Sequence, residues 1–286
     1  MSEIPLVIYH ANCWDGFCAA WIARKALKDI ETFPANYGSK PPDVTGRIVY
    51  ILDFSYPREE MEKILTTARR TVVLDHHKTA AAALDGLHQP ETGMDVIFDM
   101  TKSGGRQTWQ WFTMEGYTLW TPHQPRTPWL VDYTEDRDLW RHTLPCSEEI
   151  NAALRSYPLE FELWDKFEEM NPIETLAPEG RAIRRAERQI VETHIKNAVP
   201  HIIGGHKVPV VNATVLFSEI AGELSKGQPF GACYFDRQDG KRQWSLRSDE
   251  NGVDVSAIAK MYGGGGHAHA AGFEDTRPNL SEIIHV

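Results

Sequence analysis

Hydrophobic and polar positions in the first half of the chain alternate between short apolar runs and helical patterns. Four runs rich in β-branched residues predict strands, at 6–9, 48–52, 71–74 and 96–98. Between and after them, apolar residues recur at helical spacing, which predicts helices over 16–28, 58–69 and 105–114. Strands that alternate with helices favour an α/β fold built on a parallel sheet.

Beyond Pro178 the pattern changes to one long helix, followed by a second set of short elements. Strand-like runs lie at 208–215, 231–235 and 243–247, helical patterns at 218–225 and 255–261, and a glycine run at 263–266 is typical of a flexible turn. The stretch 117–128 holds three prolines and is expected to be irregular. The sequence therefore predicts a catalytic domain over 1–177, a connector helix over 178–198 and a smaller α/β domain over 199–286.

The balance of charges limits the partners. Forty acidic residues oppose 30 basic ones, for a formal net charge of -10, which is the wrong sign for a broad surface that holds long duplex nucleic acid. The first ten residues match neither a signal peptide nor a membrane span, so a cytoplasmic protein without a membrane partner is expected. Four scattered cysteines lack CxxC spacing, and we expect reduced structural thiols, with Cys13 only packing.

Polar side chains follow the predicted strands at the point where each strand ends. Because the carboxyl ends of parallel strands meet at one edge of a sheet, these side chains are expected to converge on one crevice. An acidic segment, LVDYTEDRDLW, adds three further carboxylates. The candidates are His10, Asp15, Asp53, Asp75, His76, His77, Asp132, Asp136 and Asp138.

Imidazole and carboxylate ligands without thiolate suit Mn²⁺ or Mg²⁺. One bridging carboxylate would hold two such ions about 3.5–4 Å apart, an arrangement that clamps the attacking and leaving oxygens of a phosphoryl displacement. Taken singly, each residue has an ordinary structural alternative, since a strand-end Asp often caps a helix and a lone His often makes only a hydrogen bond. The combination favours hydrolysis of a phosphoester.

The triplet Asp75-His76-His77, directly after the run VVL, is the most specific local feature of this half. Two adjacent histidines at a strand end point in different directions. We therefore expect one to bind metal and the other to face the substrate phosphate, while Asp75 orients an imidazole from behind.

The run GGGGHAHAAGF at 263–273 is the second specific feature. Glycines let the backbone approach an anion closely with its N–H groups, and His267 can donate to a phosphate oxygen. A loop that is merely flexible is the alternative, but it would not predict the histidine or the small residues that follow. Upstream, Arg247 stands at a strand end, where its guanidinium could hold a phosphate in bidentate fashion.

At this point the motifs, taken in order, resemble the DHH phosphoesterase superfamily, in the nanoRNase-like or oligoribonuclease-like branch that pairs a DHH domain with a C-terminal DHH-associated domain. The matching segments are HANCWDGFCAAW, YILDFSYP, VVLDHHKTA, TKSGG, DRDLW, SLRS and GGGGHAHAAGF. The resemblance implies a five-stranded parallel domain joined by a long helix to a smaller α/β domain. It also implies two divalent ions, with Mn²⁺ favoured and Mg²⁺ as the alternative.

The resemblance further implies a role for each matching residue. Metal ligands would be His10 and Asp15 at one ion, Asp53 bridging both, and His76 and Asp136 at the second. The catalytic pair would be His77 at the scissile phosphate with Asp75 in support, and the substrate residues would be Arg247, Gly264, Gly265, Gly266 and His267, with Ser103 and Gly104 lining the cleft.

The family's activities leave three functions open for this chain. A small acidic protein best fits hydrolysis of short single-stranded oligonucleotides or dinucleotides to mononucleotides. The alternatives are a phosphatase on a nucleoside bisphosphate and a nucleotide-binding protein of weak activity. The last is motivated by the first motif, where the spacing from His10 to Asp15 is one residue longer than usual and Asn12 or water would replace a carboxylate. A homodimer is compatible with the sequence.

Overall fold

The computed structural model describes residues 4–117 and 127–276, and most of the stretch expected to be irregular at 117–128 lies outside these ranges. The chain divides into two compact units, residues 1–184 and 185–286. The division falls inside the long helix α8, Pro172–Ile195, which contains most of the predicted connector but begins before Pro178.

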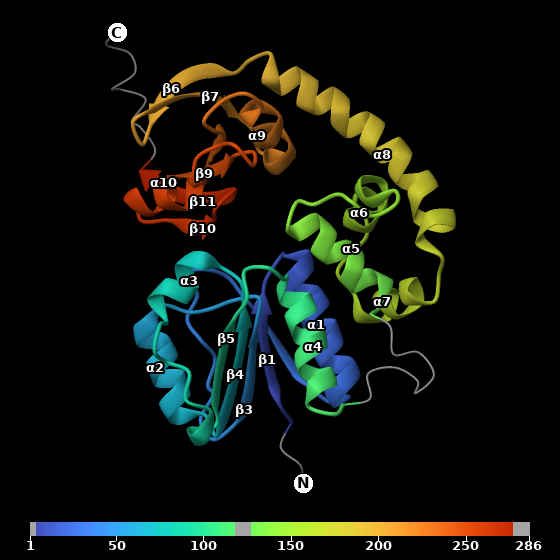
Figure 1. Cartoon of the computed structure of the whole chain (residues 1–286), viewed down its shortest axis with the longest axis vertical. Coiled ribbons are helices and arrows are strands. Elements are labelled where there is room, and N and C mark those ends of the chain that lie inside the picture. The colour runs from blue at the N-terminus through green and yellow to red at the C-terminus, as the bar shows by residue number, and fades with distance from the viewer. Residues whose placement is uncertain (1–3, 118–126, 277–286) are drawn as a thin grey trace. The chain divides into compact units, whose positions relative to one another are not determined.

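The first unit is built on a five-stranded parallel sheet with the order β2-β1-β3-β4-β5, as expected for an α/β fold (Figure 1). Its strands are β1 Leu6–His10, β2 Glu31–Ala35, β3 Ile48–Leu52, β4 Arg70–Asp75 and β5 Met94–Phe98. The hydrophobic pattern predicted four of these strands and missed β2. That strand lies at the sheet edge, is only partly buried and contains Pro34, so it lacks an apolar run.

Helices cover both faces of this sheet (Figure 1). The apolar side of α1, Trp14–Leu27, packs with α4, Gly104–Met114, on one face, and α2, Arg58–Thr67, covers the other. Trp109 and Trp111 pack against the core of the first face. The remaining elements of this unit are α3 Lys78–Ala83, η1 Pro90–Thr92, α5 Trp129–Asp138, α6 Ser147–Arg155 and α7 Phe161–Glu168.

The strand order determines where a ligand can bind. The chain passes from β1 to β2 on one side and then returns to β3 on the other side of β1, so neighbouring connections leave in opposite directions. Open α/β sheets bind ligands at such a switch point, outside the carboxyl ends of the strands. The carboxyl ends of β1 and β3 therefore mark the expected site.

The second unit holds a six-stranded mixed sheet with the order β10-β11-β9-β8-β7-β6. Only β7 and β8 are parallel among its neighbouring strands. Its elements are β6 Val199–Ile203, β7 His206–Asn212, α9 Phe217–Ser225, β8 Gly231–Asp236, β9 Lys241–Arg247, α10 Val255–Met261, β10 Gly265–His267 and β11 Ala270–Thr276. Among the described residues, no helix has both the length and the apolar character needed to cross a bilayer.

The glycine run is not a flexible turn, which corrects the expectation from its composition. Gly265 and Gly266 belong to β10, which pairs with β11 in an antiparallel hairpin. A Cβ on Gly264 would lie 2.1 Å from the carbonyl oxygen of Gly272, and one on Gly266 would lie 2.5 Å from that of Ala270. The glycines are therefore needed for close approach of two backbones.

Candidate metal centre

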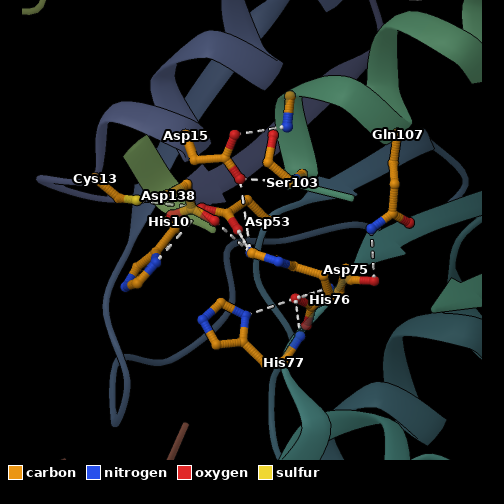
Figure 2. A network of polar contacts seen from close by, with 12 residues as sticks. His10, Cys13, Asp15, Asp53, Asp75, His76, His77, Ser103, Gln107 and Asp138 are labelled. Carbon is orange, nitrogen blue, oxygen red and sulfur yellow. Dashed lines mark hydrogen bonds and ion pairs between the residues drawn. The ribbon is translucent and has the colours of Figure 1, made fainter. Parts of the chain in front are cut away.

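Polar residues from three parallel strands and two helices meet at the carboxyl edge of the first sheet (Figure 2). His10 ends β1, Asp53 directly follows β3, and Asp75 ends β4. Asp15 lies in the first turn of α1, and Asp138 is the last residue of α5. Segments that are distant in sequence thus supply one cluster, as the pattern of strand ends predicted.

His76 is the centre of an oxygen-rich group. Its Nε2 lies 3.1 Å from Asp53 Oδ1, 3.4 Å from Asp138 Oδ2 and 3.6 Å from Asp15 Oδ2. The side chains of His76, Asp15 and Asp53 are each 1% exposed. Three carboxylates brought this close in a buried place repel one another unless a cation or protons compensate.

Asp53 also faces a second group, through its other oxygen. Asp53 Oδ2 accepts a hydrogen bond from Cys13 Sγ at 3.3 Å and lies 3.7 Å from His10 Nδ1. The backbone of Asp53 is left-handed, with φ 55°, and its N–H donates to the carbonyl of Leu74 in the neighbouring strand. This conformation directs one carboxylate toward both groups, the arrangement needed for a bridging ligand.

The N-terminus of α4 holds Asp15 in place. The N–H groups of Gly104 and Gly105 donate to Asp15 Oδ2 and Oδ1 at 2.5 and 2.9 Å. A Cβ on Gly104 would lie 2.5 Å from the Cβ of Asp53, so only glycine fits there. Ser103 caps the helix by accepting from the N–H of Arg106.

Ser103 and Gly104 were expected to line a cleft, and the structure places both in the interior. Ser103 is fully buried and Gly104 is buried. The N–H of Gly104 faces inward and donates to the Asp15 carboxylate. The function of Ser103 and Gly104 in this structure is to position Asp15 and Asp53.

His77 is oriented by Asp75, as the DHH triplet suggested. His77 Nδ1 lies 2.7 Å from Asp75 Oδ1, which also accepts the backbone N–H groups of both histidines. Asp75 Oδ2 accepts from Ser55 Oγ at 2.6 Å. Burial alone would raise the pKa of Asp75, but the charge and hydrogen bond of His77 outweigh it and lower that pKa. Because an ionised carboxylate only accepts, Nδ1 of His77 carries a proton.

The structure places Asp138, rather than the predicted ligand Asp136, beside the cluster. The Asp136 carboxylate accepts from Thr143 N and Oγ1, Leu144 N and Ser147 Oγ, at 2.9, 2.8, 3.4 and 2.5 Å. It therefore closes the loop between α5 and α6 and does not face the cluster. Two residues on from it, Asp138 reaches His76 instead. The third candidate of this segment, Asp132, pairs with Arg106.

The pKa values of the cluster reflect crowded negative charge. Burial and the charges of Asp53 and Asp138 raise the pKa of Asp15 well above its usual range. For Asp53, the neighbouring imidazoles of His10 and His76 outweigh burial and lower the pKa well below its usual range. The carboxylates also raise the pKa of His76 well above normal, although burial opposes this. The cluster therefore retains protons that a divalent cation would displace.

Two buried atoms without hydrogen-bond partners indicate whether the side chains of the cluster suit a metal ion. His10 Nδ1 and Asp138 Oδ2 have no hydrogen-bond partner among the described residues. Ligand atoms of His10, Cys13 and Asp53 all lie within 4.8 Å of one another, as do those of Asp15, Asp53 and His76. Two adjacent groups that share Asp53 are suited to two ions. The residues present therefore fit the expected cofactor.

Sequence reasoning did not place two residues at this site. Cys13, which we expected only to pack, contacts Asp53. Tyr37 is 59% exposed, yet its ring centroid lies 5.2 Å from that of His10 and 6.1 Å from that of His77. The spacing of Cys13 between His10 and Asp15 was a usable signal for the first. No local pattern marked Tyr37, which follows β2, the strand that the hydrophobic pattern missed.

The predicted substrate residues of the second unit lie on its sheet. Arg247 ends β9, where its guanidinium donates to Ser218 Oγ at 2.7 Å and to the carbonyl of Leu246 at 2.8 Å. His267 ends β10 at the hairpin described above. Arg247 pairs in register with Ala270, and Ala270 pairs with His267, so Arg247 and His267 lie on the two strands that flank β11, opposite the same residue.

Comparisons with known proteins agree with these observations. Residues 212–286 match the DHHA1 domain family. The uncharacterized protein R106 of Acanthamoeba polyphaga mimivirus is 28% identical over 300 residues, covering 95% of this chain and 67% of that protein. Oligoribonuclease NrnB of Bacillus subtilis is 28% identical over 302 residues, covering 93% of this chain and 71% of that protein.

A solved structure extends the likeness of fold to the whole chain. The pGpG-specific phosphodiesterase PggH from Vibrio cholerae shares 14% identity and a TM-score of 0.53, over 99% of this chain and 96% of that one. The fold, the order of the motifs and the matched C-terminal domain lead to one conclusion: residues 212–286 match the DHHA1 domain family, and the chain as a whole is similar to proteins that include oligoribonuclease NrnB.

Proposed function

We propose that this protein is a metal-dependent phosphodiesterase that hydrolyses short single-stranded oligonucleotides or dinucleotides to mononucleotides. The observation that carries the proposal is Asp53, whose two carboxylate oxygens face separate groups of buried metal-capable side chains. The substrate class is supported by the similarity to oligoribonuclease NrnB. The acidic net charge of -10 also favours short substrates over long ones.

Each group of the cluster is assigned to one ion. His10 with Asp53 would hold the first, and Asp15, Asp53, His76 and Asp138 the second, so that Asp138 takes the place first given to Asp136. Bound divalent ions would supply Lewis-acid activation of water and would neutralise charge at phosphorus. Mn²⁺ is proposed over Mg²⁺ because imidazoles contribute to both groups.

His77 is proposed to stabilise the scissile phosphate. Asp75 fixes the ring through Nδ1, which leaves the imidazole in one orientation. Although burial opposes it, the charge of Asp75 raises the pKa of His77 above its usual value. A cationic, fixed imidazole is complementary to the negative charge that develops on the phosphate oxygens in the transition state. Asp75 is therefore a positioning residue that acts through His77.

The second unit is proposed to bind the substrate away from the scissile bond. Arg247 and His267 lie opposite Ala270 on the two strands that flank β11, and the backbones of Gly264 and Gly266 approach β11 closely. Gly265 pairs with Gly272 of the same strand. A guanidinium and an imidazole suit a phosphate or a terminal nucleotide. A cytoplasmic location and a homodimer also remain proposals.

A panel of substrates tests this function. Di-, tri-, penta- and 20-nucleotide RNA and DNA and a nucleoside 3′,5′-bisphosphate are incubated with Mn²⁺ or Mg²⁺, and the products are separated by chromatography. We expect mononucleotides, formed fastest from the shortest chains. Asp53→Asn is expected to lower the rate by roughly 100-fold or more, whereas the exposed Asp85→Asn is the matched control and should not change it.

Other outcomes of the panel would replace the proposal. Equal rates at every length would contradict a short-substrate enzyme. Product from the bisphosphate alone would indicate a phosphatase. Binding of nucleotides without any metal-dependent product would indicate a nucleotide-binding protein.

A further inference from the structure

The thiol of Cys13 lies at the candidate metal centre. The sequence pattern suggested that this residue only packs. Ligand atoms of His10, Cys13 and Asp53 lie within 4.8 Å of one another, and Cys13 Sγ is 3.3 Å from Asp53 Oδ2 (Figure 2). Cys13 is one of four free cysteines and is half-buried. This group adjoins the oxygen-rich group around His76 and shares Asp53 with it.

The side chain of Cys13 does not serve the helix that it precedes. Cys13 occupies the N-cap position of α1 in an extended conformation and makes no capping hydrogen bond. Its sulfur is directed to Asp53 instead. The residue before it, Asn12, is left-handed with φ 55°, a conformation that Asn tolerates better than most residues. The longer first motif thus brings a sulfur, rather than a carboxylate or an amide, to Asp53.

An independent observation indicates that this group is built for a ligand. The buried Nδ1 of His10 has no hydrogen-bond partner among the described residues, although Asp53 Oδ2 lies 3.7 Å away. A buried polar atom without a partner is unfavourable. Coordination of a cation by His10 and its two neighbours would satisfy that nitrogen and offset the charge of Asp53.

We propose that Cys13 is a thiolate ligand of the ion at the His10–Asp53 position, and that this position therefore selects a thiolate-accepting transition metal such as Zn²⁺, Fe²⁺ or Co²⁺ over Mg²⁺. The inference rests on the metal dependence of the proposed function and adds to it a residue and a selectivity. On binding, the S–H bond breaks, the metal–sulfur bond forms, and one proton leaves to solvent. Sulfur ligands suit soft and borderline metals, whereas Mg²⁺ takes oxygen.

Cobalt spectroscopy tests the thiolate directly, without a substrate. The full chain is titrated with Co²⁺, and the near-ultraviolet band of thiolate-to-cobalt charge transfer is followed. We expect the band in the wild-type protein and in the control Cys146→Ser, and its absence in Cys13→Ser. X-ray absorption of the Zn²⁺ form should show a sulfur neighbour at about 2.3 Å, which is lost in Cys13→Ser.

Metal affinity tests the selectivity. Cys13→Ser should weaken Zn²⁺ binding by at least about tenfold while Mg²⁺ binding is retained. Cys13→Asp, which restores an oxygen ligand at the same place, should bind Mn²⁺ and Mg²⁺ without the charge-transfer band. Thermal melting of both variants shows whether each is folded, and the Asp variant keeps the test open if the Ser variant does not fold.

The outcomes separate this inference from the proposed function. Stoichiometric Co²⁺ binding without the charge-transfer band in wild type, or an equal band in Cys13→Ser, would overturn the thiolate ligand even if oligonucleotides are hydrolysed. A Cys13-dependent band in a protein that hydrolyses no oligonucleotide would support the ligand and refute the function.

Discussion

Two aspartates of α5, only two positions apart, have separate tasks. In an α-helix such residues project about 200° apart around the axis, so one surface can receive only one of them. Asp138 lies beside His76, whereas Asp136 accepts hydrogen bonds from the following loop. Both residues are aspartates of the same motif, DRDLW. They differ only in the direction in which each projects from the helix.

A pair of matched substitutions separates these tasks. Asp138→Asn should weaken divalent-metal binding and lower hydrolysis by roughly 10-fold or more, with little change in stability. Asp136→Asn should reduce the free energy of unfolding by about 1–3 kcal/mol, because it weakens charge-assisted bonds to Thr143 and Ser147. Calorimetric metal titration and urea denaturation measure the two effects. If Asp136→Asn impaired metal binding in a protein of normal stability, the assignment of Asp138 would be wrong.

Tyr37 offers an exposed aromatic face beside His10 and His77. Stacking of a base on such a ring contributes about 1–3 kcal/mol. We expect Tyr37→Leu to raise KM for a dinucleotide by roughly 5-fold or more with a smaller effect on kcat, and Tyr37→Trp to preserve KM. Steady-state kinetics check this. A fall in kcat alone would instead place Tyr37 in the support of His10 or His77.

At the scale of elements, the N-terminus of α4 holds the carboxylates of the cluster in position. Its first N–H groups bind the Asp15 carboxylate, and its glycines allow the helix to lie against Asp53 and Cys18. An N-terminus with unpaired N–H groups and a positive dipole stabilises a buried carboxylate. Asp15 of α1 and Asp53, which follows β3, are thus held together by the N-terminus of a helix that adds no carboxylate of its own to the cluster.

Gly104→Ala tests this arrangement. The added methyl group would meet Asp53 at a distance that forces one of the two backbones to move. We expect a loss of about 1–3 kcal/mol in the free energy of unfolding together with weaker metal binding. Thr113→Ala, at an exposed position near the other end of α4, is the control. Unchanged metal affinity in Gly104→Ala would show that Asp53 tolerates the displacement.

The sequence predicted elements well where burial imposes a pattern and poorly where it does not. Strands β1, β3, β4 and β5 have apolar runs and were predicted, whereas β2 is only partly buried at the sheet edge. The hairpin of β10 and β11 was missed because glycines have no side-chain pattern, and its reason is the close approach of backbones.

Candidate ligands were predicted from strand order rather than from spacing. His10, Asp53 and Asp75 stand at carboxyl ends of parallel strands, so topology alone brought them together. Ser103 and Gly104 matched a cleft motif, but the depth at which they are buried is set by packing between helices. The burial of Ser103 and Gly104 cannot be read from composition. The same holds for the directions in which Asp136 and Asp138 project from their helix.

At the scale of the whole molecule, the cluster links stability to pH and to metal. Folding raises the pKa of His76, so its stabilising contribution is complete below about 6.5, the value in the unfolded chain, and is lost as the pH rises through the folded value. Asp15, whose pKa is also raised, opposes folding once it ionises. Asp53 and Asp75, whose pKa values are lowered, change stability only at acidic pH.

Without metal, the melting temperature should therefore fall as the pH rises from about 6 to about 9. A divalent cation displaces the retained protons, so the increase in melting temperature on adding Mn²⁺ should grow over the same range. Thermal melts in chelator and in excess Mn²⁺ measure both slopes. Asp15→Asn should reduce the slope of the metal-free protein, and a flat profile in wild type would contradict the charge balance described for this cluster.

The left-handed backbone of Asp53 has an evolutionary consequence. Asparagine adopts that conformation at least as readily as aspartate, so the polypeptide would accept the exchange while its charge is lost. One base change in the codon converts the first amino acid into the second. A single mutation, Asp53→Asn, would therefore give a folded protein that has lost the charge of Asp53. We expect such a protein to bind nucleotides without cleaving them.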